Sequence, residues 1–185
     1  RNMKDYKTMQ IYKWPHETLS QVAKETNITD FTTDLPDDDI ERFENDVILA
    51  MLSKNGIGLA ANQLGYLNRF FAIGHRYFKH FKKPVVVWNP KIINQSKEEM
   101  LDEEGCLSFP QILVKVKRPR LVEVEYETSD TAKYTTILDG IESKCFQHEL
   151  DHLNGITFNK RVSKARWQMK KKIRPRKPQK NHQFI

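Results

Sequence analysis

Residues 147–155, QHELDHLNG, place two histidines four positions apart with a glutamate directly after the first. Positions four apart share one face of an α-helix, because one turn takes 3.6 residues. On such a face His148 and His152 can hold one metal ion, and Glu149 can reach a water molecule on that ion. Histidine pairs at this spacing also occur on helices that bind nothing. The glutamate between them favours the metal site, because hydrolytic sites use such a base.

A catalytic metal site usually combines three protein ligands with one open position, so a third ligand is needed. Zinc metallopeptidases with this helix motif take it from downstream. Here no Asp or Glu follows Asp151, and Phe158 stands at the last position of the longer HExxHxxGxxH pattern. His182 lies in a stretch that we predict to be a disordered tail. The third ligand should therefore come from upstream.

The two cysteines are the upstream candidates. Cys145 lies one turn before His148 on the same helix face, but positions 145 and 152 are about 10.5 Å apart along a helix axis. Metal bonds are only about 2.0–2.3 Å long, so three ligands spread over two turns do not converge easily. We therefore interpret Cys145 as an apolar neighbour and Cys106, beside Gly105 in EEGCLSFP, as the third ligand. A buried, inert cysteine is the alternative for Cys106.

Three motifs, in order, resemble those of the peptide deformylase family. They are GIGLAANQ at 56–63, EGCLS at 104–108 and HELDH at 148–152. The resemblance covers most of the chain, and MQIYKWPHETL near its start looks like the family's opening strand and proline turn. The leucine in EGCLS fits the bacterial and organellar type. The departures from the family's usual pattern, none of which removes a ligand or the catalytic acid, are Asn62, Phe109, Gln111 and Leu113.

The resemblance implies a metal-dependent hydrolase that removes the formyl group from the N-formylmethionine of nascent peptides and releases formate. It implies one Fe2+ per chain, replaceable by Zn2+, Ni2+ or Co2+, and the ligand types alone do not choose among iron, zinc and cobalt. Glu149 would move protons, and the Gln63 side-chain amide and the Leu107 backbone N–H would stabilise an oxyanion. The implied metal ligands are Cys106, His148 and His152.

The resemblance also implies a peptide-binding side. Gly56 and Gly58 let the backbone lie close to an extended peptide, which can add as a strand to an exposed edge. An apolar pocket for the methionine side chain would include Leu107. Glu104 either pairs with Arg118 or is a solvated acid, and Asp151 has the same two interpretations. The expected substrate-binding residues are Ile57, Gly58, Glu104, Gly105, Ile141 and Cys145.

The elements that position these residues follow from periodicity and turn signals. The predicted helices are 34–56, 142–153 and 164–173, the last capped by Ser163. The predicted strands are 69–74, 83–93, 112–116 and 120–128. The basic and aromatic segment 75–84 is interpreted as an exposed loop, with a partner contact as the alternative. Strands without βαβ alternation predict an α+β fold, in which mostly antiparallel strands pack around a central metal-binding helix, with a C-terminal helix.

Composition and charge limit the classes of protein to which this chain can belong. The 185 residues are 38% hydrophobic and 30% charged, and no apolar run approaches the roughly 20 residues of a membrane helix. Two cysteines suggest a reducing compartment rather than a disulfide scaffold. The net charge of +7 is uneven, because the last 34 residues carry 11 Lys and Arg and no acids. We expect a catalytic domain at 1–163 and a basic C-terminal helix and tail at 164–185.

The basic segment suggests a second partner. Bacterial members of the family resemble this arrangement and dock on the ribosome through a basic C-terminal helix, so the segment is a candidate for contact with ribosomal RNA. A solvated tail is the alternative. The residues expected to face phosphate are Lys170, Lys171, Lys172 and Arg174.

The sequence leaves an alternative open for the cellular compartment and others for the function. A Lys/Asn/Ile-rich chain with no starting Met resembles an apicomplexan plastid form after transit-peptide removal, with the bacterial cytoplasm as the alternative. The two other functions considered are a zinc endopeptidase of the HExxH type and an RNA-binding protein with an inactive site. The intact catalytic positions argue against the second of these.

Overall fold

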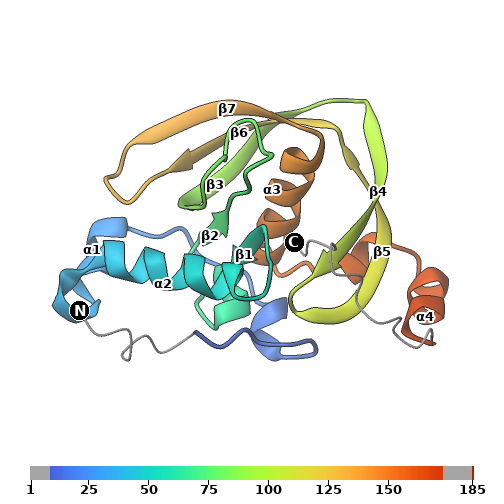
Figure 1. The fold of residues 1–185 in the computed structure, drawn as a ribbon, viewed down its shortest axis with the longest axis horizontal. Coiled ribbons are helices and arrows are strands. Elements are labelled where there is room, and N and C mark those ends of the chain that lie inside the picture. Colours follow the sequence, from blue (N-terminus) through green and yellow to red (C-terminus); the bar gives the residue numbers. More distant parts are fainter. Residues whose placement is uncertain (1–8, 173–184) are drawn as a thin grey trace.

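Two antiparallel sheets enclose a central helix in this computed structural model, which describes residues 9–172 and 185 (Figure 1). The strands are β1 (Gly58–Ala60), β2 (Phe70–Ile73), β3 (Val85–Gln95), β4 (Glu99–Cys106), β5 (Phe109–Pro119), β6 (Leu121–Glu127) and β7 (Lys133–Asp139). The α-helices are α1 (Ile28–Thr33), α2 (Ile40–Leu52), α3 (Gly140–Leu153) and α4 (Lys164–Lys172). The short 3-10 helices are η1 (Glu17–Ser20), η2 (Pro36–Asp38), η3 (Ala61–Leu64) and η4 (Phe158–Arg161).

The larger sheet has the strand order β1-β2-β3-β6-β7, and β4 and β5 form a separate hairpin. All the pairings in both sheets are antiparallel. Along the hairpin the register runs from Glu99↔Pro119 to Gly105↔Leu113 and then shifts, so that Cys106 pairs with Phe109. Such an irregularity re-aims side chains, and here it falls at the residue that the sequence marks as a metal ligand.

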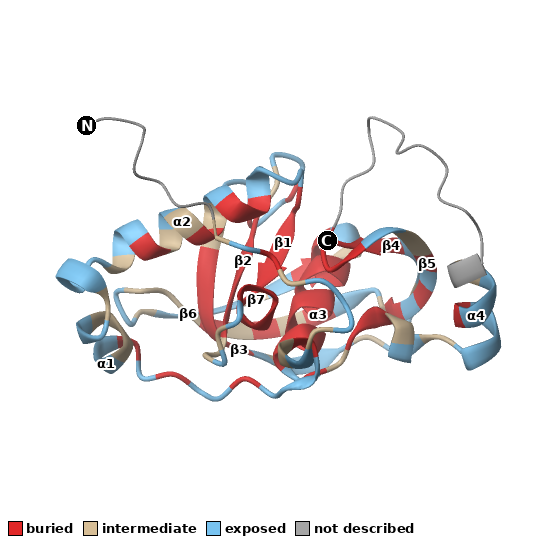
Figure 2. Cartoon of the chain, turned by 90° about the horizontal axis from the view of Figure 1, so that it is seen from below, coloured by how far each residue is buried: buried red, intermediate tan, exposed pale blue. Residues whose placement is uncertain are grey.

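Helix α3 lies between the hairpin and the larger sheet and is buried on nearly all sides (Figure 2). Gly140, with a φ of +61°, makes the turn out of β7, and Gly155, with a φ of +68°, ends the helix. The N–H of Ile156 bonds back to the Asp151 carbonyl at 2.9 Å, which closes the last turn. A Cβ on Gly155 would lie 2.6 Å from the Ser20 carbonyl oxygen, so this turn also packs closely on another segment.

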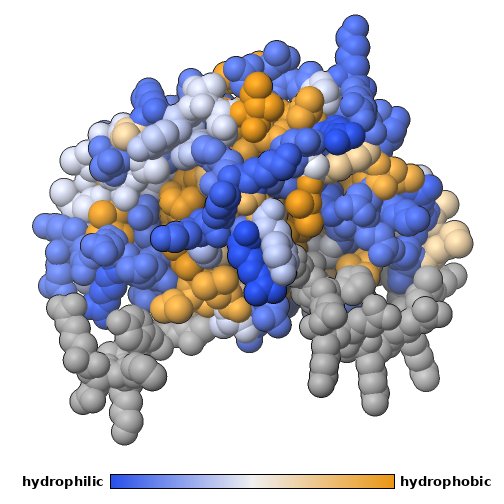
Figure 3. All heavy atoms as spheres, turned by 45° about the horizontal axis from the view of Figure 1, so that its top comes forward, coloured by the Kyte–Doolittle hydropathy of each residue, from blue (hydrophilic) through white to orange (hydrophobic). Residues whose placement is uncertain are grey.

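The main core lies between the larger sheet, α2 and α3. Helix α2 presents Phe43, Val47, Ala50 and Met51 to it and keeps its other face toward solvent. The Asp39 carboxylate accepts from the Arg42 N–H at 2.8 Å and caps this helix. A smaller cluster joins the hairpin to η4 and α4, where Trp167 is 7% exposed and packs near Phe109 and Phe158. On the face seen in Figure 3, hydrophilic side chains separate apolar patches.

The expected α+β fold, with antiparallel strands, a central helix and a C-terminal helix, is confirmed. Each of the four predicted strands overlaps an observed one. The first helix begins later than predicted, because residues 36–38 form a 3-10 turn in which Asp37 and Asp38 have positive φ. The opening strand is absent from the described residues 9–16, where Tyr12 and Trp14 instead donate single backbone bonds to Gln63 and Ser108.

Three strands and one helix were not predicted: β1, β4, β7 and α1. Strand β4, with the sequence EMLDEEGC, exposes most of its first five residues and lacks an apolar alternation. Segment 75–84 is partly exposed, and the Glu142 carboxylate accepts N–H bonds from its residues 79–81. Within the described residues, no helix is long and apolar enough to cross a membrane.

Candidate metal centre

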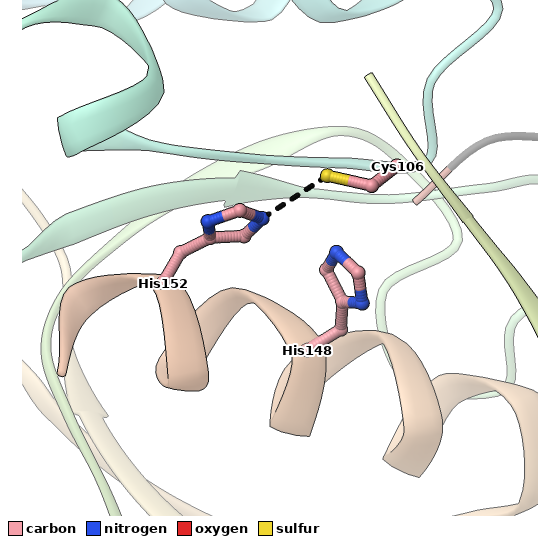
Figure 4. Close-up of side chains that lie close together, drawn as sticks. All are labelled: Cys106, His148 and His152. Atoms are coloured by element: carbon pink, nitrogen blue, oxygen red, sulfur yellow. Dashed lines mark hydrogen bonds between the residues drawn. The ribbon is translucent and has the colours of Figure 1, made fainter. Parts of the chain in front are cut away.

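Cys106, His148 and His152 meet between the hairpin and α3 (Figure 4). Cys106 is the last residue of β4, and the two histidines lie one turn apart on α3. One possible ligand atom from each residue lies within 4.8 Å of the other two, and all three side chains are buried. The structure thus brings together the three residues that the sequence proposed as ligands, from two segments far apart in the chain.

The hydrogen bonds of these three side chains fit a metal ion. His148 donates from Nδ1 to Glu104 Oε2 at 2.9 Å, which leaves its Nε2 without a partner. His152 Nε2 lies 3.2 Å from Cys106 Sγ. Buried polar atoms normally have partners, so an unsatisfied imidazole nitrogen beside a thiol and a second imidazole suits a cation such as iron, zinc or cobalt.

Burial controls the protonation of these groups in the metal-free protein. It lowers the pKa of His152 well below its usual value, so the imidazole stays neutral and keeps a lone pair. Burial, together with the charge of Glu149, raises the pKa of the Cys106 thiol. An ion that binds here would therefore displace a proton from the sulfur, and metal binding should release protons.

A buried ion-pair network supports His148. Arg118 donates to both oxygens of Glu104, at 2.5 and 2.9 Å, and to Asp151 Oδ2 at 2.8 Å. Arg161, from η4, also pairs with Asp151. Burial alone would raise the pKa of Glu104, but the hydrogen bonds from His148 and Arg118 outweigh it and lower the pKa to about 2. Glu104 is therefore an anion that orients the imidazole, which keeps its other nitrogen free.

Glu149 is fully buried, and neither carboxyl oxygen has a hydrogen-bond partner among the described residues. Burial and the nearby Glu104 charge raise its pKa well above the usual value. Its carboxyl group faces β1, where a Cβ on Gly58 would lie 2.4 Å from Glu149 Oε1. A buried carboxyl without partners destabilises the fold, so its presence beside three potential ligands points to a role in proton transfer.

Gln63 presents its amide to the same centre. Its Oε1 accepts from the Ala60 N–H at 2.8 Å, which fixes the amide orientation. Its Nε2 donates to Ser108 Oγ at 3.0 Å and lies 3.7 Å from Cys106 Sγ. The amide nitrogen is therefore held near the cysteine sulfur. The other expected oxyanion donor, the Leu107 N–H, takes part in none of these bonds.

The remaining expected residues divide by burial. Ile57 and Cys145 are buried, Cys145 Sγ lies 3.5 Å from the Ile57 carbonyl, and Cys145 is not part of the group of three potential ligands. Ile141, at the start of α3, remains 46% exposed. The Gly105 backbone carbonyl accepts a hydrogen bond from the Ile185 N–H. Glu104, one of the expected substrate-binding residues, directs its two oxygens to His148 and Arg118.

Sequence reasoning missed four residues around the site. Ser108 receives the Gln63 amide, Arg161 extends the ion-pair network, and Lys13 donates to the Leu107 carbonyl at 2.5 Å. Ile185 falls in the predicted disordered tail, but its side chain is only 3% exposed and it bonds to Gly105 and Leu107. Of these, only Ser108 had a sequence signal, its position inside the EGCLS motif.

Comparisons with known proteins agree with this geometry. The sequence model for the polypeptide deformylase family matches residues 8–168. The peptide deformylase of Rhizobium meliloti (strain 1021) is 38% identical over 133 residues, which are 72% of this chain and 76% of that protein.

Two solved structures are also similar. The peptide deformylase of Synechococcus elongatus in complex with actinonin has a TM-score of 0.76 and 31% identity, and the match covers 88% of this chain and 83% of that one. The Met-Ala-Ser-bound enzyme of Acinetobacter baumannii has a TM-score of 0.74 and 30% identity, with coverage of 84% and 98%.

Proposed function

The chain belongs to the polypeptide deformylase family, and we propose that Cys106, His148 and His152 hold its catalytic metal. As a family member it is a metal-dependent hydrolase that removes the formyl group from formylated nascent peptides. The observation that carries the residue assignment is the buried set of three ligand atoms within 4.8 Å, next to a carboxyl group that has no other partner.

The proposed ion is Fe2+, one per chain, with Zn2+, Ni2+ or Co2+ as replacements. One thiolate and two neutral imidazoles suit each of these ions. When bound, the ion supplies Lewis-acid polarisation and makes water a stronger nucleophile near neutral pH. All other steps in the proposal belong to side chains and backbone groups of the protein.

Glu149 is the proposed proton carrier. It takes a proton from water as the water oxygen adds to the formyl carbon, and it returns that proton to the amine nitrogen as the C–N bond breaks. Formate and a free amino terminus are the products. A carboxyl group whose pKa is raised by burial holds a proton closer to neutral pH than an ordinary glutamate, which suits both halves of this transfer.

Gln63 Nε2 and the Leu107 N–H are the proposed donors to the oxyanion that develops on the formyl oxygen. Gln63 is supported by its fixed amide and by its distance of 3.7 Å from Cys106 Sγ. Leu107 is supported by its position directly after Cys106, because its backbone N–H is then adjacent in the chain to the proposed metal ligand. One such donor is worth about 10²–10³ in rate.

The methionine side chain has a proposed pocket of apolar and small residues. Ile57, Leu107 and Cys145 are all buried residues of the main core. Gly58 leaves room for the Glu149 carboxyl group, which a Cβ would contact. The proposed lining residues are Ile57, Gly58, Leu107, Ile141 and Cys145, with the Gly105 backbone alongside.

Formate release from formyl-Met-Ala-Ser tests this function. The peptide matches Met-Ala-Ser, which is bound in the Acinetobacter baumannii relative. We expect formate and Met-Ala-Ser in equal amounts, and no cleavage of the Ala–Ser bond. Cleavage of internal peptide bonds alone would favour the zinc endopeptidase alternative, and RNA binding without formate release would favour the inactive alternative. The comparisons support neither alternative.

We further propose that residues 164–185 act as a basic extension of a catalytic domain at 1–163 and touch ribosomal RNA. In α4, Lys164 and Arg166 are exposed and Lys170 is partly exposed, while Trp167 is buried in the smaller cluster. The helix can therefore stay attached while its basic residues face a partner. The side chains of Lys171 and Lys172, as well as Arg174, lie outside the described residues.

The proposed compartment is a plastid, with the bacterial cytoplasm as the alternative. The support is the Lys/Asn/Ile-rich composition together with the bacterial-type EGCLS motif. Plastids translate with bacterial-type machinery, which starts proteins with formylmethionine and so provides this substrate. The location of the full-length protein, fused to a fluorescent reporter and compared with a plastid marker, tests this proposal.

A further inference from the structure

Ile185 pairs with the backbone beside the proposed metal ligand. Its N–H donates to the Gly105 carbonyl at 3.2 Å, and its carbonyl oxygen accepts from the Leu107 N–H at 3.1 Å. These two bonds flank Cys106 and make one rung of a parallel strand pairing. In Figures 1 and 2 the mark for this end of the chain accordingly lies close to β4.

The side chain of Ile185 is also engaged. It is 3% exposed and belongs to the main apolar core, which also contains Ile57, Leu107 and Cys145. These three residues line the proposed pocket for the methionine side chain. Isoleucine and methionine have similar volumes and are both apolar, so the buried Ile185 side chain resembles the substrate side chain that the pocket would receive.

The backbone bonds of Ile185 use groups that the proposed reaction needs. A peptide that adds to a strand edge needs free N–H and C=O groups on that edge, and here Gly105 and Leu107 supply them. The Leu107 N–H that donates to Ile185 is also the proposed oxyanion donor. Ile185 and a formyl-peptide therefore compete for the same N–H and the same strand edge.

We propose that Ile185 is an internal competitor, which occupies the peptide-binding cleft until a formylated peptide displaces it. This inference rests on the proposed function of the site. Because Ile185 is joined to the catalytic body, its local concentration is high, and a weak contact is enough for substantial occupancy. Substrate affinity then falls in proportion to the fraction of molecules with an open cleft. Occupancy of about 90% would raise KM about tenfold and leave kcat unchanged.

Kinetics of Ile185→Asp in the metal-loaded full chain test the competition. A carboxylate is poorly accommodated in an apolar cluster, so the variant should vacate the cleft. We expect KM for formyl-Met-Ala-Ser to fall by about fivefold or more, with kcat unchanged. The matched control is Ile137→Asp, the same substitution on β7 at a side chain that is 67% exposed, and it should keep the wild-type KM.

Hydrogen exchange gives a readout that does not depend on turnover. The Leu107 amide should be protected in the full chain and exchange at least about tenfold faster in Ile185→Asp, while amides of β6 remain unchanged. Equal Leu107 exchange in the two proteins, or equal KM, would overturn the proposal. Loss of protection on simple dilution would also overturn it, because the occupant would then come from a second copy. Absence of formate release from both proteins would instead overturn the proposed function, and the exchange result would still decide whether Ile185 occupies the cleft.

Discussion

His148 Nδ1 lies 2.9 Å from Glu104 Oε2, and both side chains are buried. The carboxylate, whose pKa is lowered to about 2, remains charged throughout the neutral range and holds the Nδ1 proton. That bond fixes the tautomer of the imidazole and leaves Nε2 available to an ion. The strength of metal binding should therefore depend on a residue that is not itself a ligand.

Replacement of Glu104 by glutamine tests this dependence. Gln can still accept from Nδ1, but it lacks the charge that polarises the imidazole and pairs with Arg118. We expect Glu104→Gln to bind the metal about 10–100-fold more weakly, measured by competition with a chelator. The control is Glu103→Gln, an adjacent and exposed carboxyl on the same strand. Equal affinity for wild type and Glu104→Gln would contradict the role.

The two cysteines provide a matched pair for the ligand assignment. Both are free and fully buried, but only Cys106 lies in the group of potential ligand atoms. Cys106→Ala should lose its metal, while Cys145→Ala should retain about one ion per chain, as measured by elemental analysis of purified protein. Full metal content in Cys106→Ala, or loss of metal from Cys145→Ala alone, would reverse the assignment.

Glu149→Gln should lower turnover, while the variant keeps its metal and loses no stability. Glu149 is not among the three proposed ligands, so the variant should keep its metal, while turnover should fall by about 10²–10⁴ because the proposed proton carrier is lost. The pKa of Glu149 is raised in the folded state, so in the metal-free protein its ionisation opposes folding at pH above its unfolded value of about 4.5. Under chelation, the variant should therefore gain thermal stability over wild type as pH rises from 4.5 to 7. Turnover near that of wild type would exclude the role.

The grouping of the three proposed metal ligands was predictable from sequence because each lies in a local pattern. A spacing of four on a helix brings His148 and His152 to one face, and the shortage of downstream ligands then selects Cys106. Ile185 had no such pattern, because its burial depends on a contact with residues about 80 positions earlier. Strand β4 was missed for a related reason: its first residues are acidic and exposed, and its pairing with β5 is what makes it a strand.

The Gln63 amide offers a kinetic prediction. In Gln63→Leu the side chain keeps a similar volume but loses Nε2, so the metal and the fold should be retained. We expect kcat to fall by about 10²–10³ with little change in KM, because the amide is proposed to act mainly in the transition state. Steady-state kinetics on formyl-Met-Ala-Ser, with metal content checked in the same sample, provide the measurement. A loss confined to KM would show that Gln63 only binds substrate.

The basic face of α4 supplies the last prediction. Truncation before α4 would also remove Trp167 and Ile185, which pack against the body, so charge removal is the cleaner test. In the full chain we would replace three exposed or partly exposed residues together, namely Lys164, Arg166 and Lys170, by alanine. The control removes the same charge from three exposed residues of segment 75–84, namely Arg76, Lys82 and Lys83.

If α4 touches ribosomal phosphate, the α4 variant should bind ribosomes more weakly than the segment 75–84 variant, measured by co-sedimentation at several salt concentrations. The slope of log affinity against log salt should fall by roughly one unit for each lysine or arginine that no longer neutralises a phosphate. Turnover of formyl-Met-Ala-Ser should remain near that of wild type, because none of the three residues reaches the metal centre. Equal affinity and equal salt dependence for all three proteins would exclude this interaction. A greater loss of affinity in the segment 75–84 variant would instead assign ribosome binding to that loop, where Glu142 holds three backbone N–H groups in place.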